Sequence, residues 1–170
     1  MPYSIYLKNE QVKRPIYSDN SVTTLYNNVT SENEGQDMNF GKETETLAFK
    51  KTTGEMKEAM ISISSILNKH GIGTLYFGVK PNGDVCGQVV SESSLRDVSR
   101  AVYESVRPQI YPAIEEVVLD GKHLIKVEFN GNNTPYSAAG RYYLRTADED
   151  REVTPEELKS FFVSNEYRVK

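Results

Sequence analysis

Gly71-Ile-Gly-Thr-Leu-Tyr-Phe-Gly-Val79 is a continuous apolar stretch near the middle of the sequence, and the turn Pro81-Asn-Gly-Asp84 follows it closely. Unbroken hydrophobicity is typical of a central β-strand that is covered on both faces. This stretch therefore predicts a sheet with further structure around it, and the segments on either side indicate what that structure is.

Two helices are predicted, one before and one after this strand. The motif Thr52-x-x-Glu55 resembles a capping box, and apolar residues follow it every three or four positions, so we expect a helix from about Gly54 to His70. After the strand, Ser93 or Ser94 can cap a second helix that ends before Pro108. Helices before and after a strand indicate a layered fold that mixes both element types.

The remaining strands are shorter. Residues 46–50 are β-prone, residues 114–129 predict a β-hairpin around the turn Asp120-Gly121, and residues 141–145 predict a further strand. Thr154-Pro-Glu-Glu157 is typical of the start of a third helix. The order β-α-β-α-β-β-β-α predicts an α+β fold, an α/β sandwich in which a mixed sheet packs with about three helices.

Residues 1–38 differ in composition from the rest, because Asn, Ser, Thr and Glu dominate from Ser18 to Asp37. We expect a loosely ordered N-terminal arm over residues 1–38 and one folded domain over residues 39–170. Within the arm, residues 3–7 and 14–17 are β-prone. They predict either an edge strand added to the sheet or a segment that docks on a partner subunit and makes the protein a homo-oligomer.

The length and composition exclude several classes of protein. The 170 residues suit one domain, and 38% hydrophobic residues suffice for a core. With 24 acidic and 20 basic residues the net charge is −4, so any anion site must be a local patch. The single Cys86 excludes an intramolecular disulfide and, with two histidines, a Cys/His zinc site. No membrane span or signal peptide is evident, which predicts a cytoplasmic protein.

Two common catalytic motifs are missing. Gly71-x-Gly73 lacks the third glycine of a dinucleotide fingerprint and precedes a strand instead of a helix, so we predict no nucleotide cofactor. No Gly-x-Ser-x-Gly elbow occurs, and no cue for activation surrounds Cys86. We therefore expect His70 and His123 to be structural or surface residues, with no hydrolytic triad.

Acidic clusters are stronger catalytic candidates, because convergent carboxylates can hold Mg²⁺ or Mn²⁺. Glu43 and Glu45 precede the first strand, and residues 115–116 and 148–150 supply further acids. Runs of adjacent acids are more often solvated turns or strand ends, so we predict no metal site.

A basic and aromatic set is the candidate for binding. On one face, such residues would neutralise phosphates and stack on unpaired bases. The alternative is a solvated surface with buried tyrosines, and the sequence leaves both open. In the strand at 141–145, alternation places the two arginines and Tyr143 on one face. The set consists of Lys50, Lys51, Lys69, Arg100, Arg107, Arg141, Tyr142, Tyr143 and Arg145.

The sequence carries a series of ordered motifs over about residues 40–163: residues 43–50 and 67–79, Asn82-Gly83 with Gly87, Pro108, Pro135-Tyr136 and residues 141–145. Together these motifs resemble the Schlafen-type AlbA domain. The resemblance implies an α/β domain that binds nucleic acid; bacterial members are commonly described as transcriptional regulators, ATP-binding proteins or helicase-related proteins, often with a winged helix after this domain. This chain ends before one, so we expect a fragment or a stand-alone form.

The same resemblance implies an alternative activity, because some animal relatives resemble endoribonucleases that use three acids. This sequence keeps Glu43 at the first position but has Ala48 and Lys80 at the other two. A methyl group removes a metal ligand, and an ammonium group repels a cation. We therefore predict a non-catalytic, regulatory nucleic-acid-binding domain. The alternatives are a metal-dependent endoribonuclease that relies on Glu43, Glu45 and a third acid, or an oligomerisation module.

Overall fold

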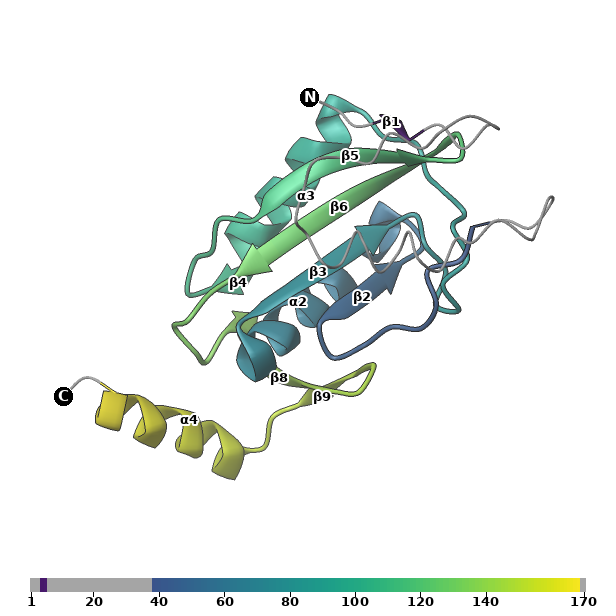
Figure 1. The fold of residues 1–170 in the computed structure, drawn as a ribbon. Helices are drawn as coiled ribbons and strands as arrows, with labels where there is room; N and C mark the ends of the chain where they lie inside the picture. Colours follow the sequence, from purple (N-terminus) through teal and green to yellow (C-terminus); the bar gives the residue numbers. More distant parts are fainter. Residues whose placement is uncertain (1–3, 6–37, 169–170) are drawn as a thin grey trace.

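A computed structural model describes residues 4–5 and 38–168, with side chains from residue 38 to residue 163 (Figure 1). A five-stranded mixed sheet in the order β1-β5-β6-β3-β2 forms one layer. The central apolar stretch is β3, which pairs in parallel with β2 and antiparallel with β6. The strands of this sheet are β1 (Ser4–Ile5), β2 (Leu47–Lys50), β3 (Ile72–Phe77), β5 (Ala113–Leu119) and β6 (Lys122–Asn130).

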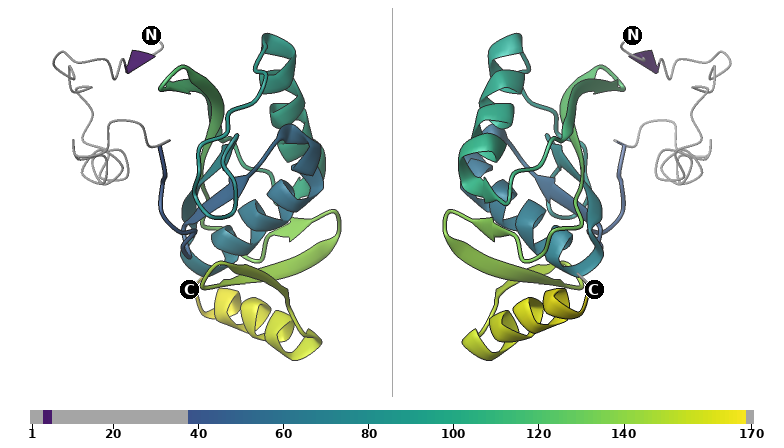
Figure 2. Two further views of the ribbon diagram at one scale, coloured as in Figure 1. Left: turned by 90° about the vertical axis from the view of Figure 1, so that its right-hand side faces the viewer. Right: turned by 90° about the vertical axis from the view of Figure 1, so that its left-hand side faces the viewer.

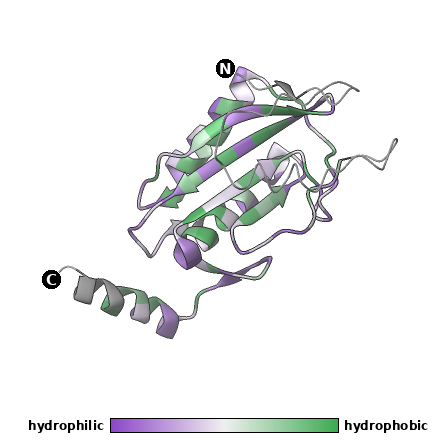
Figure 3. Cartoon of the chain, in the orientation of Figure 1, coloured by the Kyte–Doolittle hydropathy of each residue, from purple (hydrophilic) through white to green (hydrophobic). Residues whose placement is uncertain are grey.

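Two helices, α2 (Met56–His70) and α3 (Glu92–Ser105), cover one face of this sheet (Figures 1 and 2). Apolar side chains of α2 pack against alternate residues of β3 and β6; Ile63, Leu75 and Val127 are all fully buried between them. Hydrophobic and hydrophilic residues alternate along β6 from Ile125 to Asn130, as the period of a strand requires (Figure 3). The α+β fold predicted from the sequence is confirmed.

The helix caps were partly predicted. Thr52 and Glu55 form the expected capping box, but they cap a 3₁₀ turn, η1 (Thr53–Glu55), that leads into α2. Ser91 caps α3, accepting a hydrogen bond from the Ser94 backbone N–H, so the predicted cap at Ser93 or Ser94 is wrong by two or three residues. The serines of this segment all suit a cap, and sequence alone does not choose among them.

A second, four-stranded sheet in the order β4-β7-β8-β9 packs against α2. The sequence predicted only β8, and placed it in the same sheet as β3. Two of the missed strands have only two residues, which is too short for a period to be recognised. The strands of this second sheet are β4 (Val106–Arg107), β7 (Ser137–Ala138), β8 (Arg141–Thr146) and β9 (Glu149–Glu152).

The third predicted helix is α4 (Pro155–Arg168), which extends away from the two sheets (Figures 1 and 2). It begins as expected, since the Thr154 hydroxyl accepts a hydrogen bond from the Glu157 backbone N–H. None of the helices in the described part of the chain is long and apolar enough to cross a membrane.

Most of the predicted N-terminal arm lies outside the described residues. Its described part includes β1, where Ser4 and Ile5 pair in parallel with Val118 and Leu119 of β5 in the same chain. This pairing matches one of the two alternatives for the β-prone residues 3–7, an added edge strand. The β-prone residues 14–17 lie outside the described residues.

Candidate nucleic-acid interface

A groove of about 620 Å³ lies between α2, the end of α3 and the turn that joins β7 to β8. Its apolar surface comes from Met56, Met60 and Ala138. Lys57 and Arg141 supply two positive charges, and none of the residues that line the groove is acidic. In a chain with a net charge of −4, this is a local positive site with an apolar floor.

The backbone explains why these side chains meet. Alternation along β8 directs Arg141, Tyr143 and Arg145 toward α2. Ala139 and Gly140, with φ of 48° and 81°, form a two-residue turn between β7 and β8. The turn reverses the chain and pairs Arg141 with Ala138. Positive φ favours glycine, and Gly140 meets that need at the second turn position.

Both cations of the groove are available to a ligand. Lys57 is exposed and makes no ion pair with any residue in the described part of the chain. Arg141 Nη1 lies 3.4 Å from Glu152 Oε1, and the two side chains are 67% and 58% exposed. Such an exposed pair is worth about 1 kcal/mol or less, so a phosphate can replace the carboxylate of Glu152.

Two further predicted residues, Arg107 and Tyr142, line a smaller pocket of about 370 Å³ together with Phe162 of α4. Arg107 also stacks on the Tyr103 ring, with Cζ 5.7 Å from the ring centroid, and donates hydrogen bonds to the carbonyl oxygens of Tyr103 and Val106. Four of the nine predicted binding residues therefore lie beside the second sheet. Two of them line the groove and two line this pocket.

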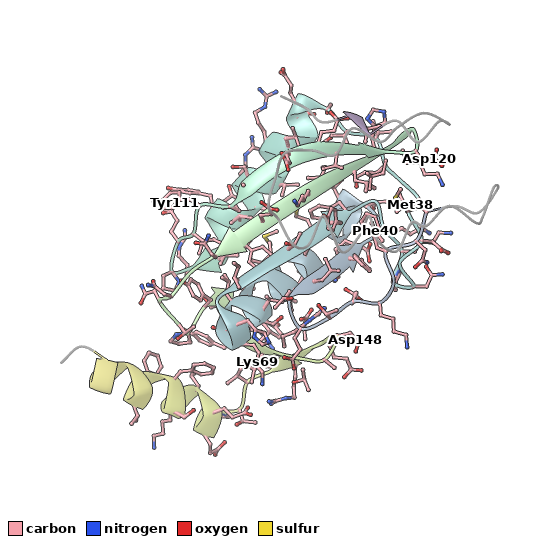
Figure 4. The ribbon with its side chains drawn as sticks, in the orientation of Figure 1. Met38, Phe40, Lys69, Tyr111, Asp120 and Asp148 are labelled. Carbon is pink, nitrogen blue, oxygen red and sulfur yellow. The ribbon has the colours of Figure 1, made fainter. Side chains whose placement is uncertain are left out.

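Four others lie elsewhere. Lys50 and Lys51 lie at the end of β2, Lys69 in the last turn of α2 and Arg100 on the exposed side of α3. Figure 4 shows Lys69 near the end of α2, on the side of the β8–β9 hairpin that carries Asp148. These four residues do not line the groove, so the nine predicted residues do not form one face.

The structure places Arg145 in the interior, where it is 1% exposed and cannot reach a phosphate at the surface. Its guanidinium donates to the carbonyl oxygens of Thr44 and Leu47, each at 3.1 Å, and pairs with Asp150 at 2.9 Å. The sequence pattern correctly grouped Arg145 with Arg141 on one face of the strand, but this face is buried at Arg145, whereas it is open to solvent at Arg141.

Asp150 was expected in a solvated acidic turn, and this expectation is wrong. Its carboxylate accepts hydrogen bonds from Ser62 and Ser65 of α2, each at 2.5 Å, besides pairing with Arg145. Both serines are fully buried. A partly buried carboxylate with these three partners is a structural link between β9 and α2.

Glu43, the first acid of the nuclease pattern, is also engaged. Its Oε1 accepts a hydrogen bond of 2.8 Å from the Phe49 backbone N–H and lies 3.7 Å from Arg145 Nη2. Ala48 is fully buried and Lys80 is exposed. Among the described residues, no three His, Cys, Asp or Glu side chains are arranged to hold a metal ion.

Two of the other acidic candidates, Glu45 and Glu116, form surface pairs with histidines. Glu45 Oε2 lies 2.6 Å from His70 Nε2, and this hydrogen bond is the main reason why the pKa of Glu45 is lowered. Glu116 pairs with His123 across the β5–β6 hairpin. Each histidine therefore has a structural partner.

Sequence reasoning did not select Lys57 as a binding residue. It lies in the first turn of α2 between Glu55 and Glu58, where a lysine is ordinarily a solvated residue. Its position follows Met56, which faces the interior, so Lys57 lies at the margin of the packed face. Lys57 becomes part of a groove only because the second sheet packs beside this margin, and the sequence did not predict that sheet.

One of two similar solved structures supports the fold. The DIP2311 protein from Corynebacterium diphtheriae matches with a TM-score of 0.59 and 15% identity over 83% of this chain, which spans 27% of that chain. The N-terminal domain of a DNA helicase RecG-related protein from Nitrosomonas europaea matches with a TM-score of 0.42 and 17% identity, covering 79% of this chain and 94% of that one. None of the curated proteins matches. The family model described as Schlafen, AlbA_2 matches residues 43–154, most of the chain, and this protein therefore belongs to the Schlafen AlbA_2 family.

Proposed function

We propose that this domain binds nucleic acid in the groove between α2 and the second sheet, and that it does so without catalysis. The observation that carries the proposal is the composition of the groove, where Lys57 and Arg141 flank an apolar floor and none of the lining residues is acidic. Lysine and arginine neutralise phosphates, and a tyrosine such as Tyr143 can contact a base or sugar. Membership of the Schlafen AlbA_2 family supports the same ligand class.

The charge balance determines what kind of binding to expect. A net charge of −4 opposes long-range attraction of a polyanion, so the affinity has to come from a few local contacts. Each phosphate contact releases counterions and makes binding weaken as the salt concentration rises. We therefore expect modest affinity and a clear salt dependence, suited to a regulatory domain that acts beside other binding elements in the cytoplasm.

The nuclease alternative has little support from the side chains. Glu43 is bound to backbone and to Arg145, and the positions of the other two acids hold Ala48 and Lys80. A metal would have to displace an existing network and would gain a single carboxylate. RNA incubated with Mg²⁺ or Mn²⁺ is expected to stay intact. Cleavage that disappears in Glu43→Ala would instead establish the nuclease.

Fluorescence anisotropy tests the binding proposal directly. Labelled duplex DNA, single-stranded DNA and structured RNA are titrated at low and near-physiological salt, with the wild-type chain and with Lys57→Ala/Arg141→Ala. We expect at least one probe to bind at low salt and the double variant to bind about tenfold more weakly. The matched control is Lys42→Ala/Lys80→Ala, which removes the same charge from exposed loop positions outside the groove.

Two results would contradict the proposal. The first is the absence of binding to every probe at low salt. The second is an equal loss in the control variant, because this would show that total charge, and not the groove, determines affinity.

A further inference from the structure

The exposed side of α3 carries a stripe of arginine and tyrosine that the groove does not include. Arg96, Arg100, Tyr103 and Arg107 follow one another at intervals of four, three and four residues, and all four are exposed. This spacing places them on one side of a helix, with Arg107 just beyond its end in β4. At a rise of about 1.5 Å per residue, the helical part of the stripe, from Arg96 to Tyr103, is about 10 Å long.

Three exposed acids of α3, Glu92, Asp97 and Glu104, lie near the stripe, and among the described residues only Asp97 pairs with one of its arginines. Asp97 Oδ1 lies 3.6 Å from Arg100 Nη1, and these side chains are 59% and 63% exposed. An exposed pair of this kind exchanges readily with another anion. Arg96 makes no ion pair with any side chain in the described residues. The stripe can therefore offer arginines to an external anion.

Aromatic rings accompany these charges. Tyr103 is 57% exposed and Tyr111, just after β4, is 86% exposed. Figure 4 shows Tyr111 at the periphery of the molecule. Exposed tyrosines and arginine planes stack on nucleic-acid bases, but in a duplex both faces of each base are covered by its neighbours. Only an unpaired strand can use these rings fully.

The stripe and the groove are neighbours. Ser105, the last residue of α3, lines the groove from the side of the helix opposite to Arg96, so a bound strand passes around the C-terminal end of α3 to contact both. Figure 2 shows α3, the start of α2 and the β7–β8 turn on the same side of the molecule. The floor at Met56 and Met60 suits an unstacked base, because it is apolar and flanked by cations.

We infer that the bound nucleic acid is a single strand that runs from the groove along the stripe on α3. Arg96 and Arg100 contact its phosphates, Tyr103 stacks on a base, and a second base enters the groove between Lys57 and Arg141. The inference rests on the proposed function, since it names the form of nucleic acid and extends the contact surface beyond the groove.

The test compares three probes in anisotropy titrations. They are a labelled single strand of about 20 nucleotides, longer than common single-strand site sizes of about 4–16, its duplex, and an abasic strand with the same backbone. The variants are Tyr103→Ala, Tyr103→Phe and Arg96→Ala/Arg100→Ala, and the charge-matched control is again Lys42→Ala/Lys80→Ala. All substituted side chains are exposed, and circular dichroism confirms that each variant is folded.

We expect the single strand to bind about tenfold more tightly than the duplex. Tyr103→Ala should weaken binding of the single strand about tenfold without affecting the abasic strand, whereas Tyr103→Phe keeps the ring and the affinity. Arg96→Ala/Arg100→Ala should reduce the slope of log K against log salt by about 1.4, at about 0.7 per phosphate contact on a single strand.

The outcomes separate this inference from the proposed function. If the duplex binds as tightly as the single strand, or if the α3 variants bind like wild type while Lys57→Ala/Arg141→Ala does not, the inference is overturned and the proposed function stands. If the wild-type chain binds none of the probes, both are overturned.

Discussion

Arg145 joins the two sheets through a single guanidinium group. On one side of β2, the carbonyl oxygens of Thr46 and Lys50 accept hydrogen bonds from the backbone N–H groups of Thr74 in β3 and Gly78 just after it. The other side of β2 is an open edge, where Arg145 donates to the Leu47 carbonyl and Glu43 accepts from the Phe49 N–H. Unpaired strand edges invite association with other chains. Glu43, the acid at the first position of the nuclease pattern, therefore covers this open sheet edge together with Arg145.

Replacing Arg145 with Met tests this role. The change leaves the carboxylate of Asp150 and the Leu47 carbonyl without their main partner in the interior, so we expect a loss of about 3–5 kcal/mol in the free energy of unfolding. Urea denaturation measures it. The control Arg141→Met makes the same chemical change at an exposed site and should cost about 0.5 kcal/mol or less. Equal effects would show that Arg145 has no special structural role.

Single residues also show where prediction from sequence ends. Alternation correctly placed Arg141, Tyr143 and Arg145 on one face of a strand, because the period of two is local. Whether that face meets solvent or α2 depends on the second sheet, which carries no local signal. For the same reason the sequence assigned Arg145 to the surface and missed Lys57.

At the scale of elements, the contact between α2 and β3 depends on the missing side chain of Gly73. A Cβ at this position would lie 2.5 Å from Ile66 Cγ2 and 2.8 Å from Phe129 Cζ. Phe129 pairs directly with Gly73 in the register of β3 and β6. The glycine therefore sets how closely the helix and the aromatic ring approach the strand.

Gly73→Ala should reduce the free energy of unfolding by about 1–3 kcal/mol, because the added methyl overpacks this contact. Chemical denaturation of Gly73→Ala, Phe129→Leu and the double variant gives the coupling between the two sites. We expect the double variant to lose less stability than the sum of the single losses, since leucine vacates the space that the methyl needs. Additive losses would contradict this explanation.

An exposed ion pair with β9 fixes the start of α4. Arg151 of β9 donates two hydrogen bonds to the Glu157 carboxylate, at 2.9 and 2.8 Å, and the Thr154 backbone N–H donates a third. The hydrogen bonds from Arg151, followed by that from Thr154, lower the pKa of Glu157 to about 2. The sequence predicted the cap, but the pairing with Arg151 depends on a strand that it did not predict.

This lowered pKa gives a pH dependence of known sign. Because Glu157 titrates lower in the folded chain than in the unfolded chain, its contribution to stability is present above about pH 4.5 and is lost as the pH falls toward about 2. NMR titration of the Glu157 carboxyl group should show this midpoint. In Arg151→Gln the midpoint should rise toward the ordinary value, and an unchanged midpoint would contradict the assignment.

For the whole molecule, the sequence established the order of the long elements, because helical and strand periods, caps and the β5–β6 turn are encoded locally. The relation between the two sheets was not predictable, since it depends on long-range contacts such as Asp150 with Ser62. The candidate groove lies at that junction. A site built between elements of the two sheets is visible only once both are placed.

The location of the groove leads to a final prediction about the stability of the entire domain. A ligand that binds only the folded chain stabilises it by about 2.7 kcal/mol at a free concentration of one hundred times Kd. For a chain of this size, each kcal/mol raises Tm by about 2–4 °C, so saturating single-stranded oligonucleotide should raise Tm by about 5–10 °C. Differential scanning fluorimetry or calorimetry measures this shift. It should shrink with added salt. In Lys57→Ala/Arg141→Ala, which we expect to bind about tenfold more weakly, it should fall to about half at the same oligonucleotide concentration, whereas Lys42→Ala/Lys80→Ala should keep it; an equal shift in the groove variant would place binding elsewhere on the molecule.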